Sequence, residues 1–524
     1  MKKILSVILA CSLVICFASC GKKTADNDTK QNIDGIKIAL SDSEITIDGV
    51  KATSNESEAV YTANDIVFYE EGHDFTYGEG GENDAHSKEE ADAHTVVHIT
   101  KAGTYVLSGT LSKGQIAVDL GEDAKKDPNA VVTLVLNGVN ITSTVAPGII
   151  FYNVYECGSD DTENADKTVD TTKAGANISI ADSTENTLNG SYVAKIYKSV
   201  VLSDDGKEIT ESKKLHKYDG SIYSNMSLNI NGDTGILNVN AENEGIESAL
   251  HLTVNGGIIN VVSGDDGLNS NEDNVSVTTI NGGTLNIKIR EGAAEGDGID
   301  SNGYIVINGG NIIAQACSTS GDSGIDSDNG IYINGGTVIA TGNMLDRISG
   351  GAQNYAVFTF RESQKDSKTY EIQNNSGETV IKFTSENSFT YLVVSSPELK
   401  GGDYSLLANG TVLSVSESEA GGMQGGFGGE RPNGDEGGQR PEDMSRPDGS
   451  NGTTPPEVPN GERPQMPGNQ ENNPPEMPSG EAPEMPNGET PEKPSGEAPT
   501  DNGNTQTGKT VFNLNAGGNN YTVY

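Results

Sequence analysis

Short runs in which apolar and polar residues alternate recur along most of the chain. Between about residues 93 and 190 they include GTYVLSGTL, VVTLVLNGVNITS and ANISIADSTENTLNGS, which are rich in Ile, Val, Thr and Asn and are punctuated by Gly. Alternation with a period of two is typical of half-buried β-strands, and Gly and Asn mark the turns between them. The chain is therefore predicted to be all-β.

From residue 219 to residue 342 this pattern becomes a repeat with two marks. The first mark is Asn-Gly, and its copies are 24, 26, 27 and 26 residues apart: Asn231, Asn255, Asn281, Asn308 and Asn334. The second mark is acid-Gly-Ile-acid-Ser, with copies at 244–248, 266–270 and 297–301 and a looser first copy at 219–224. In the last copy Ser323 replaces the first acid, and Asp322 lies one position earlier.

A period in the mid-twenties without helical signals predicts a solenoid, in which each repeat forms one coil that packs against the next. A parallel β-helix fits this pattern, because its short strands pair with those of the coils on either side. A hairpin meander is the alternative, since Asn-Gly also favours two-residue hairpin turns. Hairpins, however, require neither a fixed period nor a polar pair at a fixed phase.

The alternation also assigns side chains to the two faces of each strand. Ile299, Ile305 and Ile307 share one parity and are predicted to stack inward, whereas Asp300 has the other parity and faces out. The same holds for their counterparts one repeat later. The Asn of each Asn-Gly-Gly is predicted to hydrogen-bond to the next Asn along the axis. We therefore assign these asparagines a structural role.

The composition changes sharply near residue 417. Of the 19 prolines, 16 lie between Pro432 and Pro499, a segment that cannot bury a core and is predicted to be disordered. Residues 351–416 are predicted to cover the open end of the solenoid. The predicted segments are a signal peptide (1–20), a tether (21–34), an N-terminal β and loop segment (35–92), the parallel β-helix (93–350), a C-terminal β cap (351–416), a disordered Pro/Gly/Glu-rich tail (417–508) and a short β-like terminus (509–524).

The N-terminus has the features of a targeting segment. Lys2 and Lys3 precede an apolar run over residues 4–18, which is too short for an ordinary transmembrane helix. Small residues then precede Cys20, as in a bacterial lipobox, so Cys20 is predicted to be lipidated and to become the mature N-terminus. A plain signal peptide cleaved nearby is the alternative. The lipobox predicts a lipid-anchored protein on the extracellular face of the cell membrane.

The net charge of −42 limits the partners. Such acidity argues against nucleic acid and against anionic membrane, so the membrane is expected to be contacted only through the lipid anchor. Cations are favoured instead. Cys157 and Cys317 form neither a disulfide framework nor a zinc site. Two free thiols are expected, and a single long-range bridge is the alternative.

Stacked coils lie about 4.8 Å apart, so equivalent carboxylates become neighbours and repel one another. We expect one column with Asp266, Asp297 and Asp322, and a second that runs through Glu247, Asn269, Asp300 and Asp326. Lys288 and Arg290 are the two basic residues between positions 219 and 346, too few to neutralise these columns. Oxygen ligands of this kind suit calcium; a solvated acidic face without a specific ion is the alternative. The candidate metal ligands are Glu244, Glu247, Asp265, Asp266, Asn269, Asp297, Asp300, Asp322 and Asp326.

The phrases VTLVLNGVNITS, ISIADSTENTLNG, KYDGSIYSNMSLNING, GDGIDSNGYIVINGG and SPELKGGDYSL resemble the bacterial carbohydrate-binding domain-containing family over roughly residues 93–410. The resemblance implies a calcium-binding, right-handed parallel β-helix with a fold similar to that of pectate lyases. It also implies a surface protein that binds acidic plant polysaccharide without cleaving it.

The leading hypothesis is a cell-surface protein that binds a polygalacturonate-like glycan through calcium, without catalysis and without catalytic residues. Lys288, Arg290 and Tyr304 are auxiliary candidates for contact with the glycan. A calcium-dependent polysaccharide lyase is one alternative, which requires a Lys or Arg base beside the metal. A structural or adhesive surface protein that needs calcium to fold is the other.

Overall fold

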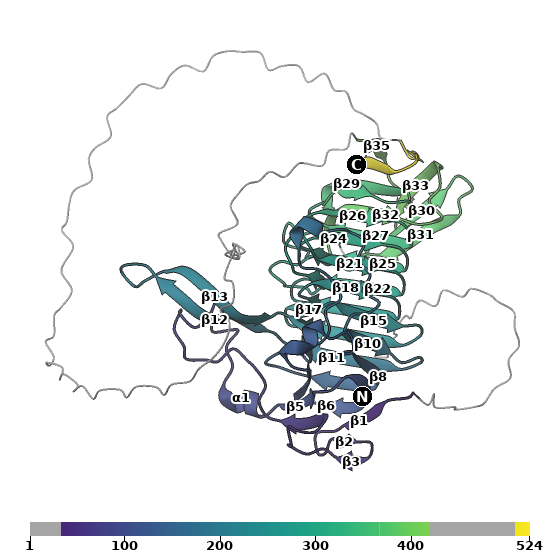
Figure 1. Ribbon diagram of the computed structural model, residues 1–524. Helices are drawn as coiled ribbons and strands as arrows, with labels where there is room; N and C mark the ends of the chain where they lie inside the picture. Colours follow the sequence, from purple (N-terminus) through teal and green to yellow (C-terminus); the bar gives the residue numbers. More distant parts are fainter. Residues whose placement is uncertain (1–32, 366, 419–508) are drawn as a thin grey trace, which may run out of the picture. The chain divides into compact units, whose positions relative to one another are not determined.

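The described part of the chain consists almost entirely of β-strands, which confirms the predicted all-β class. The computed structural model describes residues 33–365, 367–418 and 509–524 (Figure 1). The predicted signal peptide with Cys20, nearly all of the tether and the Pro-rich tail lie outside the described residues. No helix within the described residues is long and apolar enough to cross a membrane.

Equivalent strands of successive repeats pair in parallel and form three rows, two of which can be followed up the stack in Figure 1. The first row is β5 (Thr95–Ile99), β7 (Gly114–Asp119), β9 (Ile149–Asn153), β14 (Gly220–Ser224), β17 (Glu244–Ser248), β20 (Leu268–Ser270) and β23 (Ile299–Ser301). The second row is β1 (Ile36–Leu40), β6 (Gly103–Leu111), β8 (Val132–Thr142), β10 (Ala176–Ile180), β15 (Leu228–Gly232), β18 (His251–Val254), β21 (Val277–Ile280), β24 (Tyr304–Ile307), β26 (Gly330–Ile333) and β28 (Ile348–Gly350). The third row starts from the second halves of β6 and β8 and continues with β11 (Glu185–Gly190), β16 (Ile236–Ala241), β19 (Ile258–Ser263), β22 (Thr284–Ile289), β25 (Asn311–Gln315) and β27 (Thr337–Gly342).

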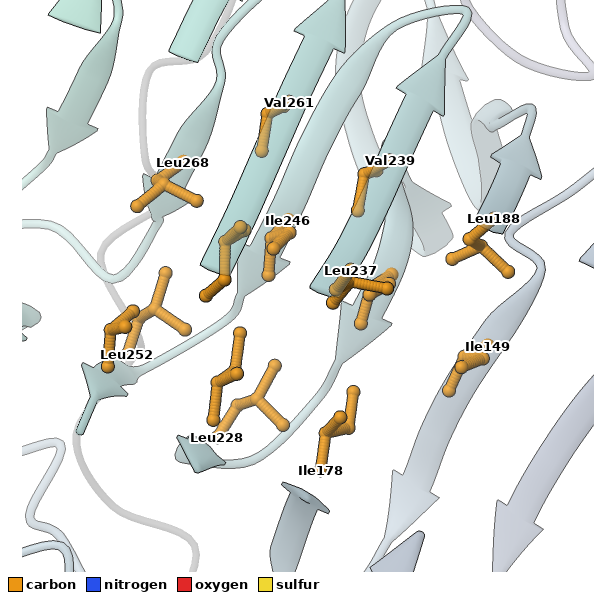
Figure 2. Close-up of a cluster of buried hydrophobic side chains, with 14 of the residues drawn as sticks. Ile149, Ile178, Leu188, Leu228, Leu237, Val239, Ile246, Leu252, Val261 and Leu268 are labelled. Carbon is orange, nitrogen blue, oxygen red and sulfur yellow. The ribbon is translucent and has the colours of Figure 1, made fainter. Parts of the chain in front are cut away.

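Aliphatic side chains fill the space between the three rows. Ile299, Ile305 and Ile307 are fully buried, as the alternation predicts. Figure 2 shows side chains from all three rows, such as Leu228, Leu237 and Ile246, pointing toward one another. Each buried side chain of this size contributes about 1.5–3 kcal/mol to folding, so one continuous core holds the successive repeats together.

An asparagine ladder runs along one corner of the stack, as predicted. In each step the side-chain Nδ2 of one Asn donates to the Oδ1 of the Asn one coil earlier at 2.9 Å, through the series Asn231, Asn255, Asn281, Asn308 and Asn334. The second glycine of each Asn-Gly-Gly has φ between 83° and 94°, a conformation that glycine adopts without strain. The repeated turn therefore needs both residue types.

A hairpin interrupts the stack between β11 and β14. Its strands β12 (Val193–Leu202) and β13 (Ile209–Tyr218) form a two-stranded antiparallel sheet (Figure 1). The hairpin ends at Tyr218, so that Lys217 is the last residue but one of β13 and Asp219 directly precedes β14. Near the N-terminus, β4 (Val60–Ala63) pairs antiparallel with β5, β2 (Thr46–Ile47) pairs with β1 and β3 (Val50–Lys51), and α1 (Lys88–Asp92) precedes β5.

Antiparallel strands end the third row. β32 (Phe389–Ser395) pairs antiparallel with β27, and β29 (Tyr355–Gln364) pairs with β32. The remaining strands of this region are β30 (Thr369–Asn374), β31 (Thr379–Thr384), β33 (Gly402–Ala408), β34 (Thr411–Val412), β35 (Val415–Glu417), β36 (Phe512–Leu514) and β37 (Gly518–Val523). Because β36 pairs with β33 and β37 pairs with β29 and β35, the final residues of the chain complete these sheets.

Replacing a core residue of one coil tests the stack directly. We expect Ile280→Ala to lower the free energy of unfolding by about 2–5 kcal/mol, because it leaves a cavity at a fully buried position. Urea denaturation followed by circular dichroism measures this change. The control is Thr279→Ala, at the half-buried neighbouring position on the other face of β21, for which we expect less than about 1 kcal/mol; equal losses would contradict the assignment of faces.

Candidate functional site

The acidic residues of the repeat gather along the first row of strands. Backbone register sets Glu247 of β17 opposite Asn269 of β20, and Asn269 opposite Asp300 of β23. A bridge from β23 to the next repeat continues this column toward Asp326. We define the acidic row as Asp219, Glu244, Glu247, Asp265, Asp266, Asn269, Asp297, Asp300, Asp322 and Asp326.

A second column runs beside the first and differs from the prediction at its end. Asp266 Oδ1 accepts a hydrogen bond from the backbone N–H of Asp297 at 2.7 Å, and Asp297 Oδ1 accepts one from the N–H of Ser323 at 2.5 Å. The prediction that Asp322 continues this column is therefore wrong. Its Oδ2 instead accepts from the N–H of Gly296 at 2.8 Å, because Asp322 lies one position before Ser323 in the chain.

The glycine within each acidic mark allows the coils to approach closely. A Cβ atom on Gly267 would lie 2.5 Å from the carbonyl oxygen of Gly298, and one on Gly298 would lie 2.5 Å from that of Gly324. Any larger residue would push the coils apart. The acid-Gly pairing thus keeps the carboxylates of successive coils close together.

Two groups of three carboxylates in the acidic row have oxygen atoms within 4.8 Å of one another. The first cluster consists of Asp219, Glu244 and Glu247, and the second cluster of Asp297, Asp300 and Asp326. All members of the first cluster are buried, whereas all members of the second are half-buried. The second cluster is therefore the more accessible to an external ligand.

Backbone and amide groups hold both oxygens of Glu247 in the first cluster. Glu247 Oε2 accepts from the backbone N–H groups of Asp219 and Gly220 at 3.2 and 3.0 Å. Glu247 Oε1 accepts from the side-chain Nδ2 of Asn271 at 2.8 Å. These contacts fix the buried Glu247 carboxylate beside the start of β14.

Two other acceptor oxygens in the row lack such contacts. The Nδ2 of Asn269 donates to Glu244 Oε1 at 3.1 Å. Glu244 Oε2 and Asn269 Oδ1, however, are buried and have no hydrogen-bond partner among the described residues. A buried acceptor without a partner is costly, and a cation is the kind of group that would satisfy both oxygens.

Burial and mutual repulsion raise the pKa values of these carboxyl groups. Burial, followed by the charge of Asp219, raises the pKa of Glu247 to about 8. Burial, followed by the charge of Asp326, raises the pKa of Asp297 to about 9. Burial is also the main cause that holds the pKa of Glu244 well above its usual value. Near neutral pH the row therefore either retains protons or requires a positive charge.

The donor set of the acidic row fits a hard divalent cation such as calcium, which prefers six to eight oxygen ligands in adaptable geometry. Zinc prefers His and Cys ligands, and the nearby candidates do not supply them. The Nδ1 of His251 accepts a hydrogen bond at 3.1 Å from the backbone N–H of Val277, the first residue of β21. Cys157 and Cys317 are free thiols and belong to neither cluster, in line with the expectation of two unbridged cysteines.

The residues predicted to contact a glycan have different surroundings in the structure. Lys288 Nζ forms an ion pair with Glu386 Oε2 at 2.6 Å. Arg290 follows β22 and is half-buried. Tyr304 faces Tyr332 one coil later, with ring centroids 6.4 Å apart.

Three residues at the ends of the row were not among the predicted site residues. Lys217 Nζ lies 2.8 Å from Asp219 Oδ2, so a basic residue from outside positions 219–346 forms an ion pair with the row. Asp219 heads the looser first copy of the acidic mark, and this signal could have identified it. At the other end, burial and then the charge of Asp326 raise the pKa of Asp346 to about 7, but Asp346 lies beyond the last mark and carries no repeat signal.

The fold and the row together define a nearly all-β protein with a repeated, oxygen-rich acidic corner. A family model described as "Carbohydrate-binding domain-containing protein" matches residues 93–412, more than half of the chain. The chain therefore belongs to this family, as the resemblance of its sequence phrases predicts.

Two individual proteins are similar to parts of the chain. A carbohydrate-binding domain-containing protein from Acetivibrio thermocellus is 32% identical over 166 residues, which cover 32% of this chain and 44% of the relative. The match thus spans less than half of that relative's length. A solved structure of a polysaccharide lyase-like protein from C. thermocellum, in a gadolinium derivative, is 23% identical with a TM-score of 0.31, covering 58% of this chain and 93% of that chain.

The raised pKa values predict how stability depends on pH without metal. Carboxyl groups such as Glu247 and Asp297 bind protons in the folded state that the unfolded chain has already released. Stability from this source is greatest at low pH and is lost as the pH rises through the folded pKa values. In a buffer with a chelator we expect the melting temperature to fall by several degrees between about pH 5 and pH 9, measured by circular dichroism.

A pair of asparagine variants separates this effect from the general charge of the chain. Asp297→Asn removes one of the carboxyl groups with a raised pKa and should flatten the decline, whereas Asp233→Asn removes an exposed carboxylate and should leave it unchanged. With excess calcium chloride the decline should shrink, because a cation binds the ionised carboxylates that high pH produces. A melting temperature that rises with pH in chelator would contradict the assignment.

Proposed function

We propose that the protein binds acidic polysaccharide at the cell surface, through a calcium ion held by the acidic row, and does not cleave it. In this proposal the three rows are the faces of a right-handed parallel β-helix. Two features support that interpretation: the strands of successive repeats pair in parallel, and the Asn ladder runs through five coils. The family to which the chain belongs supports a carbohydrate as the partner.

The second cluster is the observation that carries the proposal. Asp297, Asp300 and Asp326 bring three carboxylate oxygens within 4.8 Å of one another while remaining half-buried. Repulsion between two such charges is about 3–4 kcal/mol at an effective dielectric constant of about 20. A divalent cation there would be held by these three side chains and would supply open coordination positions for carboxylates of a polyuronate chain.

The charge and the aromatic residues of the repeat favour an acidic ligand over a neutral one. Neutral glycans are usually gripped by exposed aromatic rings, and the aromatic residues between positions 219 and 346 are Tyr223, Tyr304 and Tyr332. Tyr223 is only 6% exposed. A polygalacturonate-like chain is therefore the ligand that we expect, and Tyr304 with Tyr332 offers it only a minor contact.

The basic residues near the row are poorly suited to remove a proton from a sugar. Although burial lowers the pKa of Lys217, the carboxylates around it raise that pKa above its usual value overall, so the ammonium retains its proton. Lys288 forms an ion pair with Glu386. General-base catalysis requires a group whose pKa lies near the working pH, and this supports binding without catalysis.

Surface location is the part of the proposal that rests on the N-terminus. The lipobox-like residues before Cys20 support a lipid anchor, which would hold the protein on the extracellular face of the membrane. Incorporation of labelled fatty acid that is lost in Cys20→Ala would test this attachment.

Glycan binding should depend on both calcium and the second cluster. We expect retention of the protein on immobilised polygalacturonate in calcium chloride and its release by a chelator. The double variant Asp300→Asn/Asp326→Asn should weaken binding at least about tenfold, a loss of about 1.4 kcal/mol, because it removes two of the three carboxylates. Asp233→Asn, which removes one exposed carboxylate outside the clusters, is the control and should leave binding unchanged. Chelator-resistant retention would contradict the proposal.

Absence of catalysis gives a separate prediction. Incubation of the full chain with polygalacturonate and calcium chloride should produce no rise in the ultraviolet absorbance of unsaturated uronates over several hours. A steady rise in this absorbance that Arg290→Ala or Lys217→Met abolishes would show that the protein is a lyase, which would contradict binding without cleavage.

A further inference from the structure

One lysine contacts the acidic row from outside the repeat. Lys217 is the last residue but one of β13, and its Nζ lies 2.8 Å from Asp219 Oδ2. The Lys217 side chain is 35% exposed, whereas that of Asp219 is 3% exposed. The ammonium therefore closes the first cluster on its solvent side.

The other two members of the first cluster, Glu244 and Glu247, lie close enough to Lys217 for their charges to raise its pKa against the effect of burial. Both oxygens of Glu247 accept hydrogen bonds from N–H donors of the protein. Glu244 Oε1 accepts from Asn269, so that Glu244 Oε2 is the buried oxygen left without a hydrogen-bond partner. Lys217 thus supplies a positive charge where three buried carboxylates converge.

The second cluster is out of reach of this lysine. Asp300 lies three coils along the row from Asp219, through Glu247 and Asn269. At about 4.8 Å per coil this separation is about 14 Å, which is more than one lysine side chain can span. Both clusters consist of three carboxylates, but Lys217 contacts only the first cluster.

We propose that Lys217 is the resident cation of the first cluster and thereby confines the divalent ion to the rest of the row. The hairpin β12–β13 holds the ammonium beside Asp219, where its positive charge would repel a metal ion that approached the first cluster. This inference rests on the proposed function for the ion at the second cluster. It adds that the first cluster forms a metal site only when Lys217 is removed.

The test is the number of calcium ions bound per chain, measured by equilibrium dialysis of the full chain against calcium chloride. We expect Lys217→Met, which has a similar length but no charge, to bind one more ion than the wild type at the same free calcium concentration. An unchanged number in a folded Lys217→Met protein would overturn the inference.

Three variants complete the test. Lys213→Met removes an exposed lysine of the same strand, and Lys217→Arg keeps the charge, so both should retain the wild-type number. Asp219→Asn alters the first cluster without removing the lysine and should also retain it, which keeps the inference testable if Lys217→Met does not fold. Loss of an ion in Asp219→Asn would overturn the inference, because the first cluster would then hold metal in the wild type.

The same measurement separates this inference from the proposed function. A wild-type chain that binds no calcium would overturn both. A different set of results would overturn the inference alone. In that case the wild type binds calcium, Asp300→Asn/Asp326→Asn loses it, and Lys217→Met binds the same number of ions as the wild type.

Discussion

Parallel pairing in strict register is the interaction on which the rest of the structure depends. Because each strand lies beside the equivalent strand of the next repeat, a side chain has its own counterpart as a neighbour about 4.8 Å away. Every repeated residue type must therefore tolerate a copy of itself at that distance. Aliphatic residues such as Ile305 and Ile331 do so by burial in a shared core.

Asparagine and the acids meet this constraint in opposite ways. An amide carries both a donor and an acceptor, so Asn281 accepts from Asn308 and donates to Asn255 without help. A carboxylate has only acceptors and a charge, so its stacked copies repel. In the acidic row, backbone N–H groups and Lys217 relieve part of this repulsion, and the part that remains is the physical reason for proposing a cation.

Much of this arrangement could be predicted from the sequence, because a repeat converts chain position into spatial position. The inward isoleucines, the Asn ladder and the column through Glu247, Asn269 and Asp300 all followed from period and parity. The effect of the one-residue shift of Asp322 on the column could not be predicted, because it depends on which backbone N–H donates a hydrogen bond to its side chain. Lys217 was missed because it lies on a hairpin outside the repeat, where no period relates it to the row.

The central claim is that a divalent ion relieves the repulsion between the stacked carboxylates. Crystals of the protein grown in calcium chloride, with anomalous diffraction data, test it most directly. The account predicts an anomalous peak coordinated by oxygens of Asp297, Asp300 and Asp326. Well-ordered electron density with no such peak, and with these carboxyl groups hydrogen-bonded to one another as protonated acids, would contradict it.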